Sequence, residues 1–207
     1  MPLFEQSHHK NLRGGSIMGV SNKIDELLNA CRVTPHSDPE EGGKFYRIRS
    51  QEFKLADGTI IRREYVDKRP AAVVVPVTKN GNILAIVQPI ALSEEGSLIE
   101  LPAGYAEGDE LSAQAAMREL LEETGYSTKN IIPLGKHYQD PGLVKTPVYA
   151  FLALECERIA EQRLDEGENI KTIEISVEEM KRLMKEDYIL DANTYIALSK
   201  AMDKGLI

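Results

Sequence analysis

The segment from Gly104 to Tyr126 constrains this chain more than any other part of its sequence. It reads GYAEGDELSAQAAMRELLEETGY, and its second half places residues for a buried helix face at spacings of three and four: Ala113, Ala116, Met117, Leu120 and Thr124. Gly125 follows, where a left-handed glycine commonly ends a helix. The segment therefore predicts an amphipathic helix over residues 112–124 that packs on a core.

Three carboxylates share the other side of this predicted helix. Glu119, Glu122 and Glu123 are spaced at i, i+3 and i+4, so they lie on one narrow face. Crowded like charges destabilise a helix, and a hard divalent cation with oxygen ligands would relieve the repulsion; Mg²⁺ is the usual choice where phosphates also bind. Arg118 is expected to pair with Glu122 at i+4. A solvated acidic face is the alternative that such a helix most often represents.

The residues around these carboxylates favour the metal site over a solvated face. Gly104, Glu110 and Arg118 stand at the intervals of the pattern GX5EX7REUXEEXGU, where U is apolar, and the segment matches this pattern throughout. It thus resembles the box of the Nudix hydrolases. The resemblance implies an α/β/α sandwich with a mixed β-sheet, in which the box forms a loop, a helix and a loop.

The same resemblance implies a metal-dependent site. Glu119, Glu122 and Glu123 would bind Mg²⁺, with Mn²⁺ also possible, and the backbone carbonyl of Ala103 would join them. Gly104 would allow the sharp turn that delivers this carbonyl. Glu110 is expected to be a structural partner in the loop, with a place at the metal cluster as the alternative.

Length and patterning predict one main domain of the α/β (α+β) class. Residues 1–43 read as an N-terminal arm with a short helix over 22–32, and residues 44–207 as the Nudix hydrolase domain. We expect strands at 45–55, 59–66, 71–78, 83–88, 98–101, 131–138, 148–155 and 170–175, and later helices at 176–187 and 191–205. Asp57-Gly58 predicts a hairpin between the first two strands.

Composition excludes several classes of protein. The 207-residue chain has a net charge of −8 and no long basic cluster, which argues against nucleic-acid binding. No apolar run approaches the length of a membrane span, and the N-terminus lacks the apolar core of a signal peptide. Cys31 and Cys156 are too few for a disulfide scaffold. We therefore expect a cytoplasmic protein with no membrane partner.

Beyond the box, residues 44–204 resemble the ADP-ribose pyrophosphatase branch of the family. The resemblance is carried by Glu100-Leu101-Pro102-Ala103-Gly104, by Pro141 sixteen residues after Gly125, and by Arg62-Arg63-Glu64 with the following Arg69-Pro70. It implies that Arg62, Arg63, Glu64, Gly104 and Pro141 serve substrate binding. It also implies a homodimer in which the strands of residues 44–70 are exchanged. Pro141 would equally suit an ordinary turn.

An acidic loop over residues 164–169 matches the same branch. In the family such a loop supplies a carboxylate that acts as general base on the attacking water. Glu166 and Glu168 are the candidates, and Glu168 is favoured because it lies next to the start of a strand. A solvated acidic turn is the alternative, since a base must come within hydrogen-bonding reach of its water.

One departure from the family pattern bears on the substrate. Relatives often carry Gln-Tyr-Arg where this chain has Gln88-Pro89-Ile90, so a phosphate-binding arginine is missing, and Arg63 or Lys145 would have to compensate. The predicted reaction is hydrolysis of ADP-ribose to AMP and ribose 5-phosphate, with GDP-mannose as an alternative nucleotide-sugar substrate. Two rivals are a Nudix module that senses a nucleotide without cleaving it and a hydrolase of nucleoside triphosphates.

Overall fold

The computed structural model describes residues 20–32 and 47–207, and its main body is a mixed β-sheet between helical layers. The helices are α1 (Val20–Cys31), α2 (Ser112–Thr124), α3 (Val177–Lys185) and α4 (Ala192–Asp203). The strands are β1 (Arg47–Lys54), β2 (Ile60–Asp67), β3 (Ala71–Thr78), β4 (Ile83–Pro89), β5 (Ser97–Glu100), β6 (Ala103–Tyr105), β7 (Tyr126–Ser127), β8 (Asn130–His137), β9 (Val148–Arg158) and β10 (Lys171–Ile175).

The main sheet is built around β3. Its strands follow the order β10-β4-β3-β9-β7, while β5 pairs with β4, β6 with β3 and β8 with β9. β3 and β9 are parallel, and the other pairs are antiparallel, so the sheet is mixed. β3 is apolar along nearly its whole length, as expected for a strand buried on both faces.

Helices cover both faces of this sheet. Side chains alternate along β3, so Ala72 and Val74 pack under α2 whereas Val73 and Val75 face the other layer. On that second face, Ile24 of α1, Met180 of α3 and Leu198 of α4 join one larger core. The predicted α/β/α sandwich is therefore confirmed.

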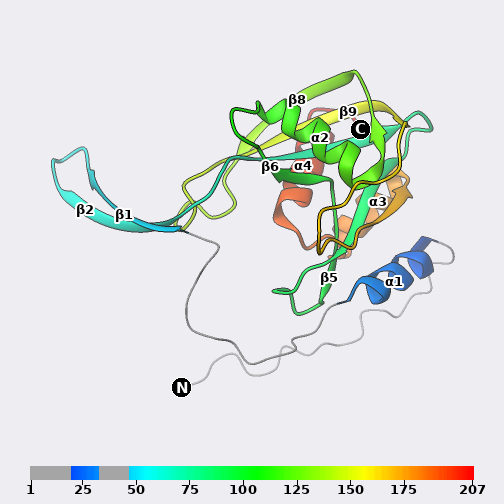
Figure 1. Ribbon diagram of the computed structural model, residues 1–207, viewed down its shortest axis with the longest axis horizontal. Helices are drawn as coiled ribbons and strands as arrows, with labels where there is room; N and C mark the ends of the chain where they lie inside the picture. The colour runs from blue at the N-terminus through cyan, green and yellow to red at the C-terminus, as the bar shows by residue number, and fades with distance from the viewer. Residues whose placement is uncertain (1–19, 33–46) are drawn as a thin grey trace.

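The β1–β2 hairpin is a separate two-stranded sheet that extends away from the sandwich (Figure 1). Asp57 and Gly58 form its turn as predicted, with the Thr59 amide donating to Asp57 Oδ1. Every residue of β1 is exposed. The hairpin meets the sandwich near its base, where the Val66 amide donates to the Leu143 carbonyl.

Most expected elements are confirmed, including the helix over residues 112–124. Ser176 and Asp191 cap the starts of α3 and α4 through their side chains. Two short strands, β6 and β7, were not expected. They have three and two residues, which is too few to show the alternation of side chains that predicts a strand. Of the predicted N-terminal arm over residues 1–43, residues 1–19 and 33–43 lie outside the described residues, as does the start of the strand at 45–46. In the part of the chain that is described, no helix is long and apolar enough to span a membrane.

Candidate active site

The carboxylates of α2 are fixed because this helix is packed on the sheet and covered by β6. Ala115, Ala116 and Leu120 are fully buried against the sheet. On the adjoining side, the amide of Ala103 in β6 donates to Glu123 Oε2 over 3.1 Å. Glu123 is therefore buried, with only 4% of its surface exposed, even though its carboxyl group can carry a charge.

Gly104 lies against a second carboxylate. A Cβ atom added at this position would stand 1.9 Å from Glu119 Oε1. Any larger residue would have to displace the carboxylate or the strand. The structure thus brings Ala103 and Gly104 together with the predicted metal ligands. The family resemblance had implied this arrangement.

Arg118 organises the exposed side of the cluster. Its Nη1 donates to Glu119 Oε1 and to Glu122 Oε2, each over 2.9 Å, so the predicted pair with Glu122 is present. Its Nε donates to Glu110 Oε1 over 3.2 Å, and Glu110 Oε2 also accepts from the Glu107 amide. These contacts favour the structural interpretation of Glu110.

Burial and crowded charge both oppose ionisation of the buried carboxylates. Burial raises the pKa of Glu123 to about 9, and the charges of Glu119, Glu168 and Glu100 add to this rise. The pKa of Glu119 is also raised by burial, and Arg118 opposes that rise while Glu122 and Glu168 add to it. A cation bound at this position would stabilise the ionised forms of both groups.

The donor chemistry fits a hard divalent ion. Glu119, Glu122 and Glu123 supply carboxylate oxygens on one helix, which is the ligand type that Mg²⁺ and Mn²⁺ accept. Among the described residues, no three acidic side chains already converge as a metal-binding group. The fit therefore rests on the donor types, the buried like charges and the close approach of Gly104.

The acidic loop lies beside this cluster. Glu168 is part of a turn in which its Oε2 accepts from the Asp165 amide over 2.9 Å. Its charge contributes to the raised pKa of both Glu119 and Glu123, so its carboxylate lies near theirs. Glu166 and Glu168 are both exposed on this turn, but Glu166 does not contribute to those pKa shifts. The structure thus favours Glu168 over Glu166 as the carboxylate of this loop nearest to the metal ligands.

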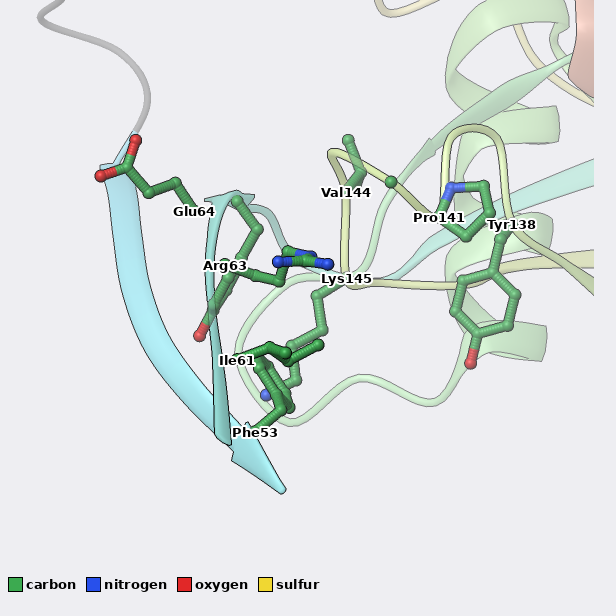
Figure 2. Close-up of a pocket in the computed structure, with 10 residues that line it drawn as sticks. Phe53, Ile61, Arg63, Glu64, Tyr138, Pro141, Val144 and Lys145 are labelled. Atoms are coloured by element: carbon green, nitrogen blue, oxygen red, sulfur yellow. The ribbon is translucent and has the colours of Figure 1, made fainter. Parts of the chain in front are cut away.

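A second group of residues, several of them predicted, lines a pocket between the hairpin and the loop that contains Pro141. The cavity measures about 310 Å³ and is bordered by Phe53, Ile61, Arg63, Glu64, Tyr65, Tyr138, Pro141, Gly142, Val144 and Lys145. Figure 2 shows that these side chains come from the hairpin on one side and the loop containing Pro141 on the other. Arg63 and Lys145, the two cations expected to replace the missing arginine, both border this pocket.

Arg62 is not among the residues that line this pocket. Its Nε donates to Ser50 Oγ over 2.5 Å, across the hairpin. Side chains alternate along a strand, so Arg62 lies on the face opposite to Ile61 and Arg63. Of the predicted substrate residues, Arg63 and Pro141 line the pocket, and Glu64 borders it with its side chain pointing away in Figure 2, while Gly104 belongs to the carboxylate cluster.

Sequence reasoning gave no role to two side chains beside the cluster. Glu100 Oε2 accepts from Gln88 Nε2 over 2.6 Å, and burial together with the charge of Asp191 raises the pKa of Glu100 to about 7. Gln162 Nε2 donates to the backbone carbonyl of Glu123 over 2.5 Å. Glu100 was quoted only as part of a family motif, and Gln162 has no motif around it.

Comparison with known proteins agrees with this geometry. The NUDIX domain model matches residues 67–196. The ADP-ribose pyrophosphatase of Bacillus subtilis is 33% identical over 75% of this chain and 84% of its own length. The GDP-mannose pyrophosphatase of Citrobacter koseri is 25% identical over 85% of this chain and 98% of its own.

A solved structure shows the same fold. The crystal structure of an ADP compounds hydrolase superposes with a TM-score of 0.67 at 20% identity, covering 82% of this chain and 92% of that one. Nudix hydrolases generally need a divalent metal ion, which the carboxylates of α2 are suited to bind. With its box unbroken and most of its length matched, the chain belongs to the Nudix hydrolase family.

Proposed function

We propose that this protein hydrolyses the pyrophosphate bond of a nucleoside diphosphate sugar, with ADP-ribose as the first substrate and AMP and ribose 5-phosphate as products. The observation that carries the proposal is the carboxylate face of α2, where Glu123 is bonded to Ala103, Glu119 lies against Gly104, and Arg118 holds Glu122 beside them. The similarity to ADP-ribose and GDP-mannose pyrophosphatases supports this substrate class.

Each group of the cluster has a distinct part in the proposed reaction. Mg²⁺, or Mn²⁺ in its place, would be held by the three glutamates and the Ala103 carbonyl, and would neutralise phosphate charge. Arg118 keeps Glu119 and Glu122 in position through its guanidinium. Glu168 accepts a proton from the attacking water. The water oxygen bonds to one phosphorus, the bridging P–O bond breaks, and one phosphate ester leaves.

The pocket between the hairpin and the Pro141 loop is the proposed site for the remainder of the substrate. Arg63 and Lys145 supply positive charge near its mouth, and Tyr138 and Phe53 supply aromatic surface for a base. Pro141 shapes the loop that closes one side. GDP-mannose remains the second candidate because the GDP-mannose pyrophosphatase of Citrobacter koseri is matched over 98% of its length.

We also propose a homodimer in which the hairpin contacts a second copy. A two-stranded hairpin is marginally stable alone, yet β1 is exposed throughout and Ile48 is 75% exposed. In such a dimer Arg62 and Glu64 would face the partner. Light scattering should give about twice the chain mass, and a monomeric mass at micromolar concentration would contradict this part. A cytoplasmic location completes the proposal, supported by two buried, unpaired thiols.

The decisive experiment is product analysis with ADP-ribose, GDP-mannose and ATP, in Mg²⁺, in Mn²⁺ and in chelator. We expect AMP and ribose 5-phosphate from ADP-ribose, with no turnover in chelator. Glu122→Gln should lower kcat by about 100- to 1000-fold while the protein stays folded. Glu178→Gln is the matched control, because Glu178 is exposed on α3 at the other face of the sheet.

Two results would contradict the proposal. Release of pyrophosphate from ATP in preference to any cleavage of ADP-ribose would indicate a hydrolase of nucleoside triphosphates. Tight binding of ADP-ribose without turnover, unaffected by Glu122→Gln, would indicate a sensing module.

A further inference from the structure

The acidic loop over residues 164–169 is held at both ends near the C-terminus of α2, the helix that carries the proposed metal ligands. The Arg163 amide, just before the loop, donates to the Glu122 carbonyl over 2.8 Å. Gln162 Nε2 donates to the Glu123 carbonyl over 2.5 Å and reaches the Ile170 carbonyl, just after the loop, at 3.4 Å. One amide group therefore spans the helix end and the two ends of the loop.

These contacts use backbone groups that the helix itself leaves free. The last four carbonyls of an α-helix have no partner within the helix. In α2, the Leu121 carbonyl accepts from the Gly125 amide, and the next two accept from Arg163 and Gln162. The segment before the loop thus caps the helix that carries the metal ligands.

Gly125 allows the segment to come this close. Its carbonyl accepts from the amides of Ile159 and Ala160, and a Cβ at Gly125 would stand 2.2 Å from the Ala160 carbonyl oxygen. After Ile170, which is buried, the chain enters β10 in the main sheet. Both ends of the acidic loop are consequently fixed relative to α2, and Glu168 lies between them.

We infer that Gln162 is a positioning residue: its side-chain amide sets the place of the Glu168 carboxylate relative to Glu119 and Glu123. This inference rests on the proposed function, in which Glu168 takes the proton of the attacking water. A hydrogen-bonded amide suits the task because it is neutral and half-buried, and so it ties two carbonyls together without adding charge beside the carboxylates.

The test is a double-mutant cycle with Gln162→Met and Glu168→Gln, measured as kcat and KM for ADP-ribose with Mg²⁺. Methionine keeps the length of glutamine but removes the donor. Gln162→Met should lower kcat by roughly 10- to 100-fold with KM within about twofold, because a displaced base slows the chemical step. In the Glu168→Gln background the same substitution should change kcat by less than about twofold.

A second measurement reports on the hydrogen bonds of Gln162 without relying on enzyme activity. In Gln162→Met, amide hydrogen exchange at Arg163 and Glu168 should be at least about tenfold faster, while the first turns of α2 keep their protection. Glu161→Gln is the matched control, because the adjacent Glu161 side chain is 88% exposed and pairs only with Arg158 among the described ion pairs. It should leave kcat and exchange unchanged.

The possible outcomes distinguish a failure of the positioning role of Gln162 from a failure of the proposed function. An equal loss of kcat in both backgrounds, or unchanged exchange in Gln162→Met, would overturn the positioning role and leave the proposed reaction intact. Full activity of Glu168→Gln alone would instead remove Glu168 as the base of the proposed function. A loss of kcat confined to the background with Glu168 intact, together with faster exchange, supports the inference.

Discussion

The carboxylate cluster and the hairpin pocket are held in place by different means. Glu123 lies within the sandwich, covered by β6 and fixed by a hydrogen bond from Ala103. Arg63 lies on a hairpin whose outer strand is exposed throughout and which meets the body at its base. In the proposed function, the chemistry would therefore rest on a rigid scaffold, while substrate selection would rest on an element with little core of its own.

This difference indicates which changes should affect turnover and which should affect binding. Substitutions in the cluster should alter kcat, metal dependence and stability, since the same contacts serve packing and chemistry. Substitutions in the hairpin should alter KM and leave stability nearly unchanged. Each prediction below tests one side of this contrast.

The largest effect is expected from Gly104→Ala. The added Cβ would stand 1.9 Å from Glu119 Oε1, so the carboxylate or β6 must shift. We expect kcat/KM for ADP-ribose to fall by roughly 100-fold or more, since misplacement of about 1 Å at a reacting site has that consequence. Steady-state kinetics with a melting curve checks this. Wild-type turnover in a folded variant would show that the cluster tolerates movement.

Gly125→Ala should be the most destabilising change, because it combines two costs. The residue has φ of 77°, and its Cβ would meet the Ala160 carbonyl oxygen at 2.2 Å. We expect a loss of about 2–3 kcal/mol in the free energy of unfolding, measured with urea. Gly81→Ala is the control: its φ is 79° but nothing lies within 4 Å, so only about 1 kcal/mol should be lost. Equal losses would mean that the contact with residue 160 is dispensable.

The stability of the metal-free protein should fall as the pH rises from about 5 to 8. Folding raises the pKa of Glu123 from 4.5 to about 9, chiefly by burial, so the folded state binds a proton that the unfolded state releases in this range. Glu100, with its pKa raised to about 7, adds to the same trend. Urea unfolding in chelator should show a decrease of roughly 4 kcal/mol from Glu123 alone, because about 1.4 kcal/mol is lost per pH unit over nearly three units.

A variant isolates the contribution of Glu123 to this trend. Glu123→Gln removes the ionisable group and should flatten most of the pH dependence between 5 and 8. Added Mg²⁺ should stabilise the wild-type protein more at pH 8 than at pH 6, because the ion binds the ionised carboxylate. An unchanged pH profile in Glu123→Gln would show that burial of this side chain is not the source.

The sequence predicted the cluster better than its surroundings for a physical reason. Glu119, Glu122 and Arg118 belong to one helix, and their relative positions follow from helical geometry alone. Gln162 meets Glu123 across 39 residues, and Glu100 meets Gln88 across two strands, so both contacts depend on tertiary packing. Gln162 lies in no local periodic pattern or motif, and the family motif that contains Glu100 says nothing of its contact with Gln88.

The hairpin shows the same limit in another form. Its two strands and its turn at Asp57 and Gly58 were predicted from alternation and turn chemistry. The pocket was not, because it joins Phe53 and Ile61 to Tyr138 and Lys145, which lie in a loop far along the chain. A sequence pattern specifies the hairpin itself but not the surface against which it is placed.

The smallest effect, and the sharpest test of the contrast, should come from two adjacent arginines. Arg63→Ala removes a cation that borders the pocket, and we expect KM for ADP-ribose to rise about tenfold with kcat within about twofold. Arg62→Ala is the matched neighbour on the opposite face, bonded to Ser50. In a monomer it should leave both constants unchanged. If Arg62→Ala raises KM as much as Arg63→Ala, the outer face of the hairpin serves a partner's substrate, and selection depends on assembly rather than on this pocket alone.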